Sequence, residues 1–216
     1  MYSFKNFIVE DTEGRKDPKS KTLHAFDIDE TLFAHDPSKV RIHVRDKKTG
    51  QRVKSLTNQE YNVHKLHPDH EYDYSEFKSS DVFRKSAHPI RSMIAKLKGI
   101  HRHNKNVELV TARSDMDDPK AFGQHLKKYG IDIGNVHVRR SGNLKIGSAA
   151  ENKAAMISSL IKKHGYNRVH LYDDSMDNLE HFQKLKQQHP DVKFHAHHVH
   201  HDPETGQTKL TTFEPV

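Results

Sequence analysis

The sequence contains no cysteine in its 216 residues. Disulfide bonds, thiolate metal sites and cysteine nucleophiles are therefore excluded, and because a reducing compartment suits such a chain best, we expect a cytoplasmic protein. No apolar run approaches the roughly 18–20 residues of a membrane span, and residues 1–20 show no signal-peptide core, which predicts no membrane partner. Hydrophobic residues make up only 33% of the chain, yet they gather into short runs between polar connections, which predicts a folded protein.

Basic residues outnumber acidic ones, since 36 Lys and Arg stand against 29 Asp and Glu, for a net charge of +7. A basic surface favours phosphorylated ligands or nucleic acids over basic partners, but it equally keeps a protein soluble. Charge alone therefore narrows the class of partner without identifying one.

Strand-like and helix-like segments alternate along most of the chain, which predicts an α/β protein with a mainly parallel, Rossmann-like, doubly wound sheet. The helical segments are marked by apolar periodicity, by Pro89 and Pro119 at predicted starts, and by Gly130 and Gly165 at predicted ends. We expect strands at 21–27, 106–111, 135–139, 168–173 and 192–199, with a further edge strand near the C-terminus, and helices at 89–103, 119–129, 151–164 and 178–189.

A segment of about 50 residues interrupts this alternation after the first strand. Two alternating stretches flank the turn-prone KKTG at 47–50 and predict a hairpin, and Thr57 with Glu60 forms a capping-box pattern that predicts a short helix. Residues 67–83 are expected to form loops and short pieces. We therefore predict a core of residues 1–33 and 84–216 and a small insert of residues 34–83.

The predicted hairpin of the insert is rich in cations. They alternate with apolar residues, so one face of the strand pair is expected to be basic. This face either recruits a phosphorylated substrate or is a solvated edge protected by charge. The residues are Lys39, Arg41, Arg45, Lys47, Lys48, Arg52 and Lys54.

Polar clusters follow three of the predicted strands. The first strand runs into Asp27-Ile28-Asp29-Glu30-Thr31, the second into Thr111-Ala112-Arg113, and a later one into the stretch Asp173–Asp177. Because ligands of open α/β sheets bind beyond the carboxyl ends of the strands, we expect these acids to meet at one edge, where their repulsion calls for a cation. Hard oxygen ligands without His or Cys point to Mg²⁺ rather than to zinc.

These clusters resemble the four motifs of the haloacid dehalogenase-like (HAD) phosphatase superfamily. The first motif matches FDIDETLF at 26–33, the second LVTAR at 109–113, and the fourth LYDD at 171–174 with Asp177. For the third motif Lys153, in the pattern ENKAAMI, is preferred over Lys145. The four occur in the family's order across residues 22–180. The layout of the insert more weakly resembles HAD proteins encoded by tailed bacteriophages, which would place the protein in the cytoplasm of a host cell.

The resemblance implies a phosphatase that acts through an aspartyl-phosphate. Asp27 is then the nucleophile, and Asp29 is the acid and base that protonates the leaving oxygen and later takes a proton from water. An acid at the position of Asp29 is typical of the family's phosphatases. Lys153 and the hydroxyl of Thr111 are expected to bind the phosphoryl oxygens, while Arg113 either grips a substrate phosphate or pairs with a surface acid.

The same resemblance implies a set of Mg²⁺ ligands. They are the carboxylate of Asp27, the main-chain carbonyl of Asp29 and the carboxylate of Asp173, with Asp174 or Asp177 acting through water. The sequence leaves the choice between the last two open.

Three functions are compatible with these residues. A Mg²⁺-dependent phosphomonoester hydrolase is the leading hypothesis. A polynucleotide 3′-phosphatase or nucleotidase that uses the same residues is the alternative among enzymes, and the basic charge motivates it. A non-catalytic nucleic-acid-binding protein on a HAD scaffold is the alternative of another class, and the complete set of acids argues against it.

The histidines at 195–201 form the densest run of one residue type in the chain. In a strand, His195, His197 and His201 share a face, so imidazoles from this run could meet at a transition metal. An exposed strand edge without a ligand is the simpler interpretation.

Overall fold

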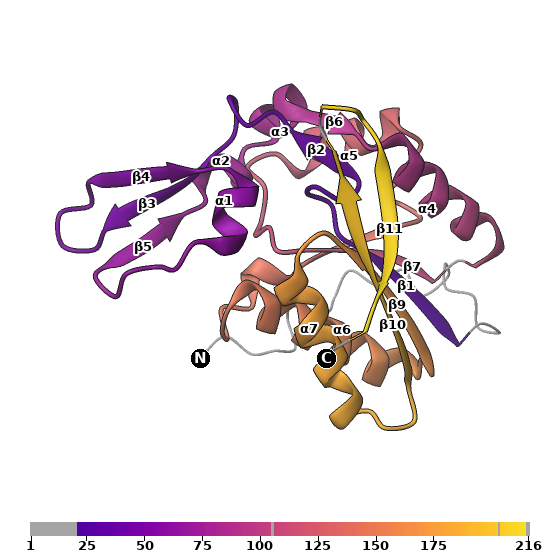
Figure 1. The fold of residues 1–216 in the computed structure, drawn as a ribbon. Helices are drawn as coiled ribbons and strands as arrows, with labels where there is room; N and C mark the ends of the chain where they lie inside the picture. The colour runs from indigo at the N-terminus through magenta and orange to yellow at the C-terminus, as the bar shows by residue number, and fades with distance from the viewer. Residues whose placement is uncertain (1–20, 105, 203, 215–216) are drawn as a thin grey trace.

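A computed structural model describes residues 21–104, 106–202 and 204–214, and its centre is a six-stranded sheet (Figure 1). The strands run in the order β11-β10-β9-β1-β7-β8, with the first five in chain order parallel and β11 antiparallel at one edge. The predicted α/β class with a mainly parallel sheet is confirmed, and the arrangement is compatible with a Rossmann-like fold. The strands are β1 (Thr22–Phe26), β7 (Val107–Thr111), β8 (His137–Arg140), β9 (Arg168–Asp173), β10 (Lys193–His201) and β11 (Thr208–Phe213).

Helices cover both faces of this sheet. On one face α4 (Arg91–His103) and α5 (Pro119–Lys128) pack on a core that includes Phe26 and Leu109. On the other face α6 (Ala149–His164) and α7 (Met176–Lys184) pack on Leu23, Ala25 and Leu171. The alternation of side chains along β1 therefore supplies both cores, with Leu23 and Ala25 on one face and Phe26 on the other.

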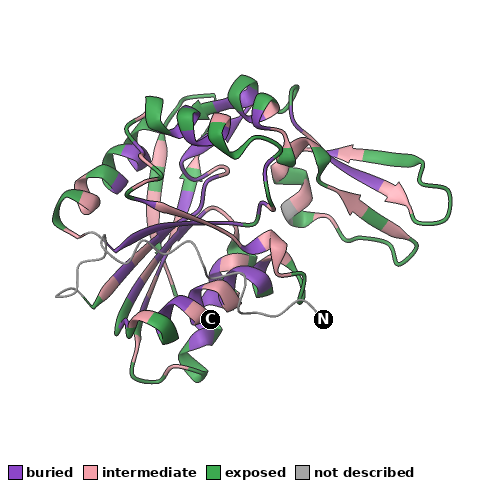
Figure 2. Cartoon of the chain, turned by 180° about the vertical axis from the view of Figure 1, so that it is seen from behind, coloured by how far each residue is buried: buried purple, intermediate pink, exposed green. Residues whose placement is uncertain are grey.

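The insert forms its own small sheet beside the central one. It contains β3 (Ile42–Asp46), β4 (Arg52–Leu56) and β5 (His70–Asp73) in the order β4-β3-β5, and α1 (Asn58–Val63) begins at the predicted capping box. The hairpin of β3 and β4 is confirmed, whereas the strand β5 replaces part of the loop region that we expected at 67–83. Figure 2 shows buried residues gathered in the middle of the central sheet, where β1, β7 and β9 are mostly buried, while the sheet of the insert is mostly exposed or intermediate.

A short pair of strands joins the insert to the core. The strand β2 (Phe33–His35) pairs antiparallel with β6 (Ala87–Pro89), and the helices α2 (Ser75–Lys78) and α3 (Ser80–Ser86) precede β6. Pro89 therefore ends a strand rather than beginning α4, which starts two residues later at Arg91.

The remaining helix boundaries follow from local signals. A capping box of Ser148 and Glu151 begins α6 two residues before the predicted start, and Gly165, with φ of 66°, ends it as predicted. The last predicted helix is shorter than expected, because α7 ends at Lys184 and a 3₁₀ turn, Leu185–Gln187, follows. Among the described residues, no helix combines the length and apolarity that crossing a bilayer requires.

Candidate active site at the carboxyl edge of the sheet

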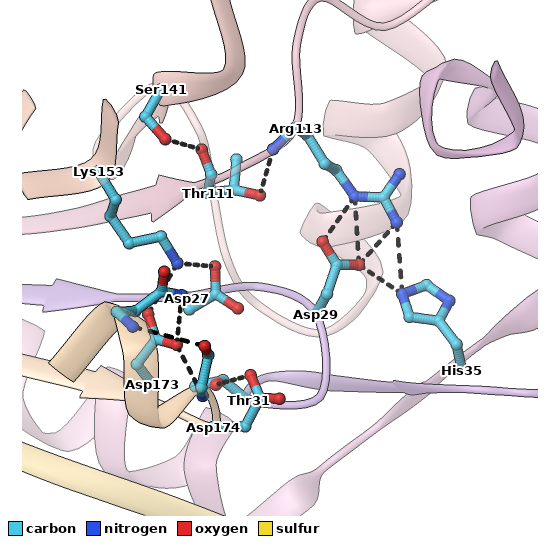
Figure 3. A network of polar contacts seen from close by, with 12 residues as sticks. Asp27, Asp29, Thr31, His35, Thr111, Arg113, Ser141, Lys153, Asp173 and Asp174 are labelled. Carbon is cyan, nitrogen blue, oxygen red and sulfur yellow. Dashed lines mark hydrogen bonds and ion pairs between the residues drawn. The ribbon is translucent and has the colours of Figure 1, made fainter. Parts of the chain in front are cut away.

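The sheet order brings the three predicted strand ends together. The strands β9, β1 and β7 are direct neighbours, so the residues that follow Phe26, Thr111 and Tyr172 lie at one edge. The main chain of Asp27 continues this pairing, since its N–H donates to the carbonyl of Tyr172 at 2.9 Å. The convergence that we predicted from the chain order is therefore present, and it creates the polar network of Figure 3.

One part of this network, which we call the acid cluster, contains Asp27, Asp173, Asp174 and Lys153. The three aspartates each offer an oxygen within 4.8 Å of the others. The Nζ of Lys153 donates to Oδ1 of Asp27 at 2.8 Å and to Oδ2 of Asp173 at 2.7 Å, and only 2% of the lysine side chain is exposed. Lys145, the other candidate for the third motif, is exposed to solvent. Of the two lysines, the structure thus brings Lys153 to the aspartates.

The charges of the acid cluster are not balanced. Burial, together with repulsion from Asp173, raises the pKa of Asp27 to about 7 although Lys153 opposes the shift. Burial and the carboxylates of Asp173 and Asp27 raise the pKa of Asp174 well above its usual value. The pKa of Lys153 is raised, since the two aspartates outweigh the effect of its burial. One ammonium therefore faces three carboxylates, which is an arrangement that a further cation would stabilise.

Neighbouring polar groups hold the acids of this cluster in place. The side chain of Asn178 donates to Oδ1 of Asp173 at 2.8 Å, and the main-chain N–H of Ser175 donates to the same oxygen at 3.0 Å. The ring of His198 contacts the main-chain carbonyl of Asp174 at 2.8 Å. Sequence reasoning missed Asn178 and His198, and only the position of Asn178, in the first turn of a helix that follows an acid, could have suggested it.

Asp177 lies apart from the acid cluster. Its side chain is 63% exposed, and its carboxylate pairs with the His181 ring at 3.1 Å. Of the two acids left open by the sequence, the structure therefore brings Asp174 to the other carboxylates.

The turn after β7 is held against the next loop. The N–H of Arg113 donates to the hydroxyl of Thr111 at 3.2 Å, and Ser141 donates to the carbonyl of Thr111 at 2.9 Å. The loop approaches so closely that a Cβ at Gly142 would lie 2.2 Å from the carbonyl oxygen of Ala112. Only glycine therefore fits at position 142. The hydrogen bond from the Arg113 N–H holds the buried hydroxyl of Thr111 at the sheet edge.

The second part of the network, which we call the arginine cluster, contains Asp29, Arg113 and His35. The Nε of Arg113 lies 2.9 Å from Oδ2 of Asp29, and its Nη2 lies 2.6 Å from Oδ1. The Nε2 of His35 lies 2.5 Å from the same Oδ1, and its Nδ1 lies 3.0 Å from the hydroxyl of Ser86. Since a carboxylate only accepts hydrogen bonds, Nε2 of His35 carries the proton in this pair.

This cluster holds Asp29 as a carboxylate. Burial favours its neutral form, but Arg113 and His35 keep the pKa of Asp29 well below its usual range. Arg113 was expected to grip a phosphate or to pair with a surface acid. It pairs with an acid whose side chain is only 18% exposed, while its own side chain is 3% exposed. Sequence reasoning did not identify His35.

The histidine run lies in β10, where only part of it gathers with other rings. His195 and His197 share a face with His170 of β9 and His24 of β1, and neighbouring rings stack with centroids 4.5–5.3 Å apart. Burial lowers the pKa of His24 and of His197 to about 4 and that of His170 to about 3. Throughout the described ranges, the aspartates of the acid cluster are the only group of three or more His, Cys, Asp or Glu residues whose ligand atoms converge, so the histidine run does not form such a group.

No protein-family model, no curated protein and no solved structure matches this chain.

Proposed function

We propose that the protein is a Mg²⁺-dependent phosphomonoester hydrolase of the HAD type that acts through an aspartyl-phosphate. The observation that carries this proposal is the acid cluster, in which three carboxylates converge at the ends of two neighbouring strands while one buried ammonium bonds to two of them. Their oxygens are hard ligands, and none of them belongs to a His or Cys, so the donor set suits Mg²⁺.

The carboxylates of Asp27, Asp173 and Asp174 and the main-chain carbonyl of Asp29 would hold the ion. When bound, a magnesium ion offsets the negative charge of phosphoryl oxygens. The ion and Lys153 together would balance the charge of the three carboxylates, so that no net negative charge would oppose the phosphate dianion of a substrate.

Asp27 is the nucleophile in this proposal. Its carboxylate oxygen bonds to phosphorus, the bond from phosphorus to the ester oxygen breaks, and the alcohol leaves with a proton from Asp29. Water then attacks the aspartyl-phosphate and gives its proton to Asp29, which releases inorganic phosphate and restores Asp27. Lys153 and the Thr111 hydroxyl bind the phosphoryl oxygens throughout.

The two halves of this cycle need opposite protonation states of Asp29. The ionised form held by Arg113 and His35 is the one that accepts the proton from water in the second half. The first half requires a protonated Asp29, or a leaving group acidic enough to depart without a proton.

The test is turnover of p-nitrophenyl phosphate by wild type and Asp27→Asn, with and without MgCl₂. We expect turnover that depends on Mg²⁺ in the wild type and a loss of at least about 10³-fold in the variant, since the nucleophile is removed. Asp191→Asn serves as the matched control, because Asp191 is exposed and lies before β10, away from the acid cluster. Equal turnover in wild type and Asp27→Asn, or none with aryl phosphates, nucleotides, sugar phosphates and 3′-phosphorylated oligonucleotides, would refute the proposal.

A further inference from the structure

Arg113 has little capacity left for a ligand. Its Nε and Nη2 face the two oxygens of Asp29 in a fork, and its Nη1 donates to the main-chain carbonyl of Phe77 at 2.5 Å. The ring nitrogen Nε2 of His35 lies 3.3 Å from Nη2, the nitrogen that also faces Asp29. A phosphate that binds a guanidinium bidentately needs two adjacent free N–H groups, and a side chain that is 3% exposed offers no approach to them.

The partners of Arg113 come from both parts of the molecule. Asp29 belongs to the loop after β1, whereas Phe77 belongs to α2 of the insert. The guanidinium carbon lies 4.9 Å from the ring centre of Phe77 and 4.8 Å from that of Phe83 in α3, so two aromatic faces enclose the charge. Arg113 itself follows β7 of the central sheet. One side chain therefore links the central sheet, the loop after β1 and the helices α2 and α3.

Two further contacts follow the same route. His35 of β2 joins Asp29 to Ser86 at the end of α3, with distances of 2.5 and 3.0 Å. The side chain of Asn58 in α1 donates to Glu30, the residue after Asp29, at 3.2 Å. The loop after β1 thus contacts the insert through Asp29 and through Glu30, and the guanidinium of Arg113 is a permanent cation next to Asp29.

We propose that Arg113 is a positioning residue that fixes the carboxylate of Asp29 and locks α2 and α3 of the insert against the sheet edge. The role in turnover rests on the proposed function, whereas the lock on the insert does not. In the proposed function, substrate phosphate is bound elsewhere, by Lys153 and the Thr111 hydroxyl.

The experiment compares wild type, Arg113→Lys and Arg113→Ala by amide hydrogen exchange and by steady-state kinetics with p-nitrophenyl phosphate and Mg²⁺. Arg113→Lys keeps a charge but not the planar fork, so it is the variant expected to fold even if Arg113→Ala does not. Arg84→Ala is the matched control, because Arg84 also pairs with an aspartate, Asp81, but on the exposed surface of α3.

We expect the amides at 75–86 to exchange faster in both Arg113 variants than in the wild type. In the control Arg84→Ala, we expect both the amide exchange at 29–35 and kcat to be unchanged. In the kinetic arm, kcat should fall by about 10²-fold while KM changes little, because a misplaced Asp29 affects the reaction rather than binding. A higher KM at unchanged kcat would show instead that Arg113 grips the substrate. Unchanged exchange at 75–86 in Arg113→Lys and in any folded Arg113→Ala would overturn the lock. If wild type shows no turnover, the proposed function fails, and the exchange data still decide whether Arg113 holds the insert.

Discussion

The acid cluster and the arginine cluster lie side by side at one sheet edge, yet they accommodate buried charge in opposite ways. In the arginine cluster, the carboxylate of Asp29 meets a bidentate guanidinium and an imidazole N–H, so its charge is fully matched by the protein. In the acid cluster, three carboxylates lie around one ammonium, which bonds to Asp27 and Asp173. The pKa values of Asp27 and Asp174 are raised.

The contrast is between an ion pair whose charge is matched and a cluster of acids whose charge is not. Removing one partner of a complete buried pair is strongly destabilising because it leaves an unpaired charge, whereas an excess of buried like charge costs stability until a cation offsets it. Mutations in either cluster are therefore expected to change the stability of the fold, whereas added cations are expected to change it only through the acid cluster.

The largest effect is expected from Lys153→Met. It leaves Asp27 and Asp173 buried without their shared cation, which should lower the free energy of unfolding by about 3–5 kcal/mol at pH 8. The loss should be smaller at pH 6, because Asp27, with its pKa of about 7, then takes up a proton. Urea unfolding at both pH values measures this, with exposed Lys162→Met as the control on the same helix. An equal, small loss in both variants would show that Lys153 does not balance the acids.

Added divalent cation should distinguish the clusters directly. Mg²⁺ at about 100 times its Kd should stabilise the wild type by about 2.7 kcal/mol, because it binds the folded chain alone. We expect Asp174→Asn to reduce this shift strongly and Asp29→Asn to retain it, since the latter keeps the main-chain carbonyl. Thermal melts across a MgCl₂ series provide the measurement. If the Mg²⁺-dependent rise in melting temperature disappears in Asp29→Asn and persists in Asp174→Asn, the cation binds at the arginine cluster and the expectation is wrong.

The two clusters can be compared only where the fold is stable, and the stacked histidines of β1, β9 and β10 are expected to lower its stability at acid pH. His24, His170 and His197 are neutral in the fold with pKa values of about 4, 3 and 4, whereas in the unfolded chain they protonate near 6.5. Their contribution is thus present above pH 6.5 and is lost as the pH falls, by at most about 2 kcal/mol per ring at pH 5.

His170→Asn should make the loss of stability between pH 6.5 and 5 less steep, because it removes the central ring of the stack. His67→Asn, at a histidine whose side chain is 63% exposed, should leave the slope unchanged. Denaturant unfolding across this pH range measures both, and identical slopes for wild type and His170→Asn would contradict the expectation.

The smallest effect is expected from Asp174→Asn without divalent cations. Since burial and neighbouring carboxylates raise the pKa of Asp174, its ionised form costs stability at high pH. Removing the charge should raise the free energy of unfolding by about 0.5–2 kcal/mol at pH 8 while turnover falls. A loss of stability in denaturant unfolding at pH 8 would mean that the acid cluster carries no excess charge.

Local patterns in the chain were sufficient for much of the fold. Periodicity and capping residues predicted the helices of the core and α1, and alternation predicted the hairpin of β3 and β4. The strand β5 was missed because the polar stretch HEYD at 70–73 has no alternation of its own, and it becomes a strand only by pairing with β3. The start of α4 was misplaced because Pro89 pairs with Phe33, a contact that is distant in sequence.

The sequence by itself determined that acids follow the buried strands β1 and β9, because strand ends are set by local apolar runs and parallel strands end at a common edge. Only the tertiary structure decided which cation each acid meets. Asp27 and Asp29 are two residues apart, yet one contacts Lys153 from α6 and the other contacts Arg113 from the turn after β7. Pairing of buried charges depends on distances across the fold, and spacing along the chain does not encode them.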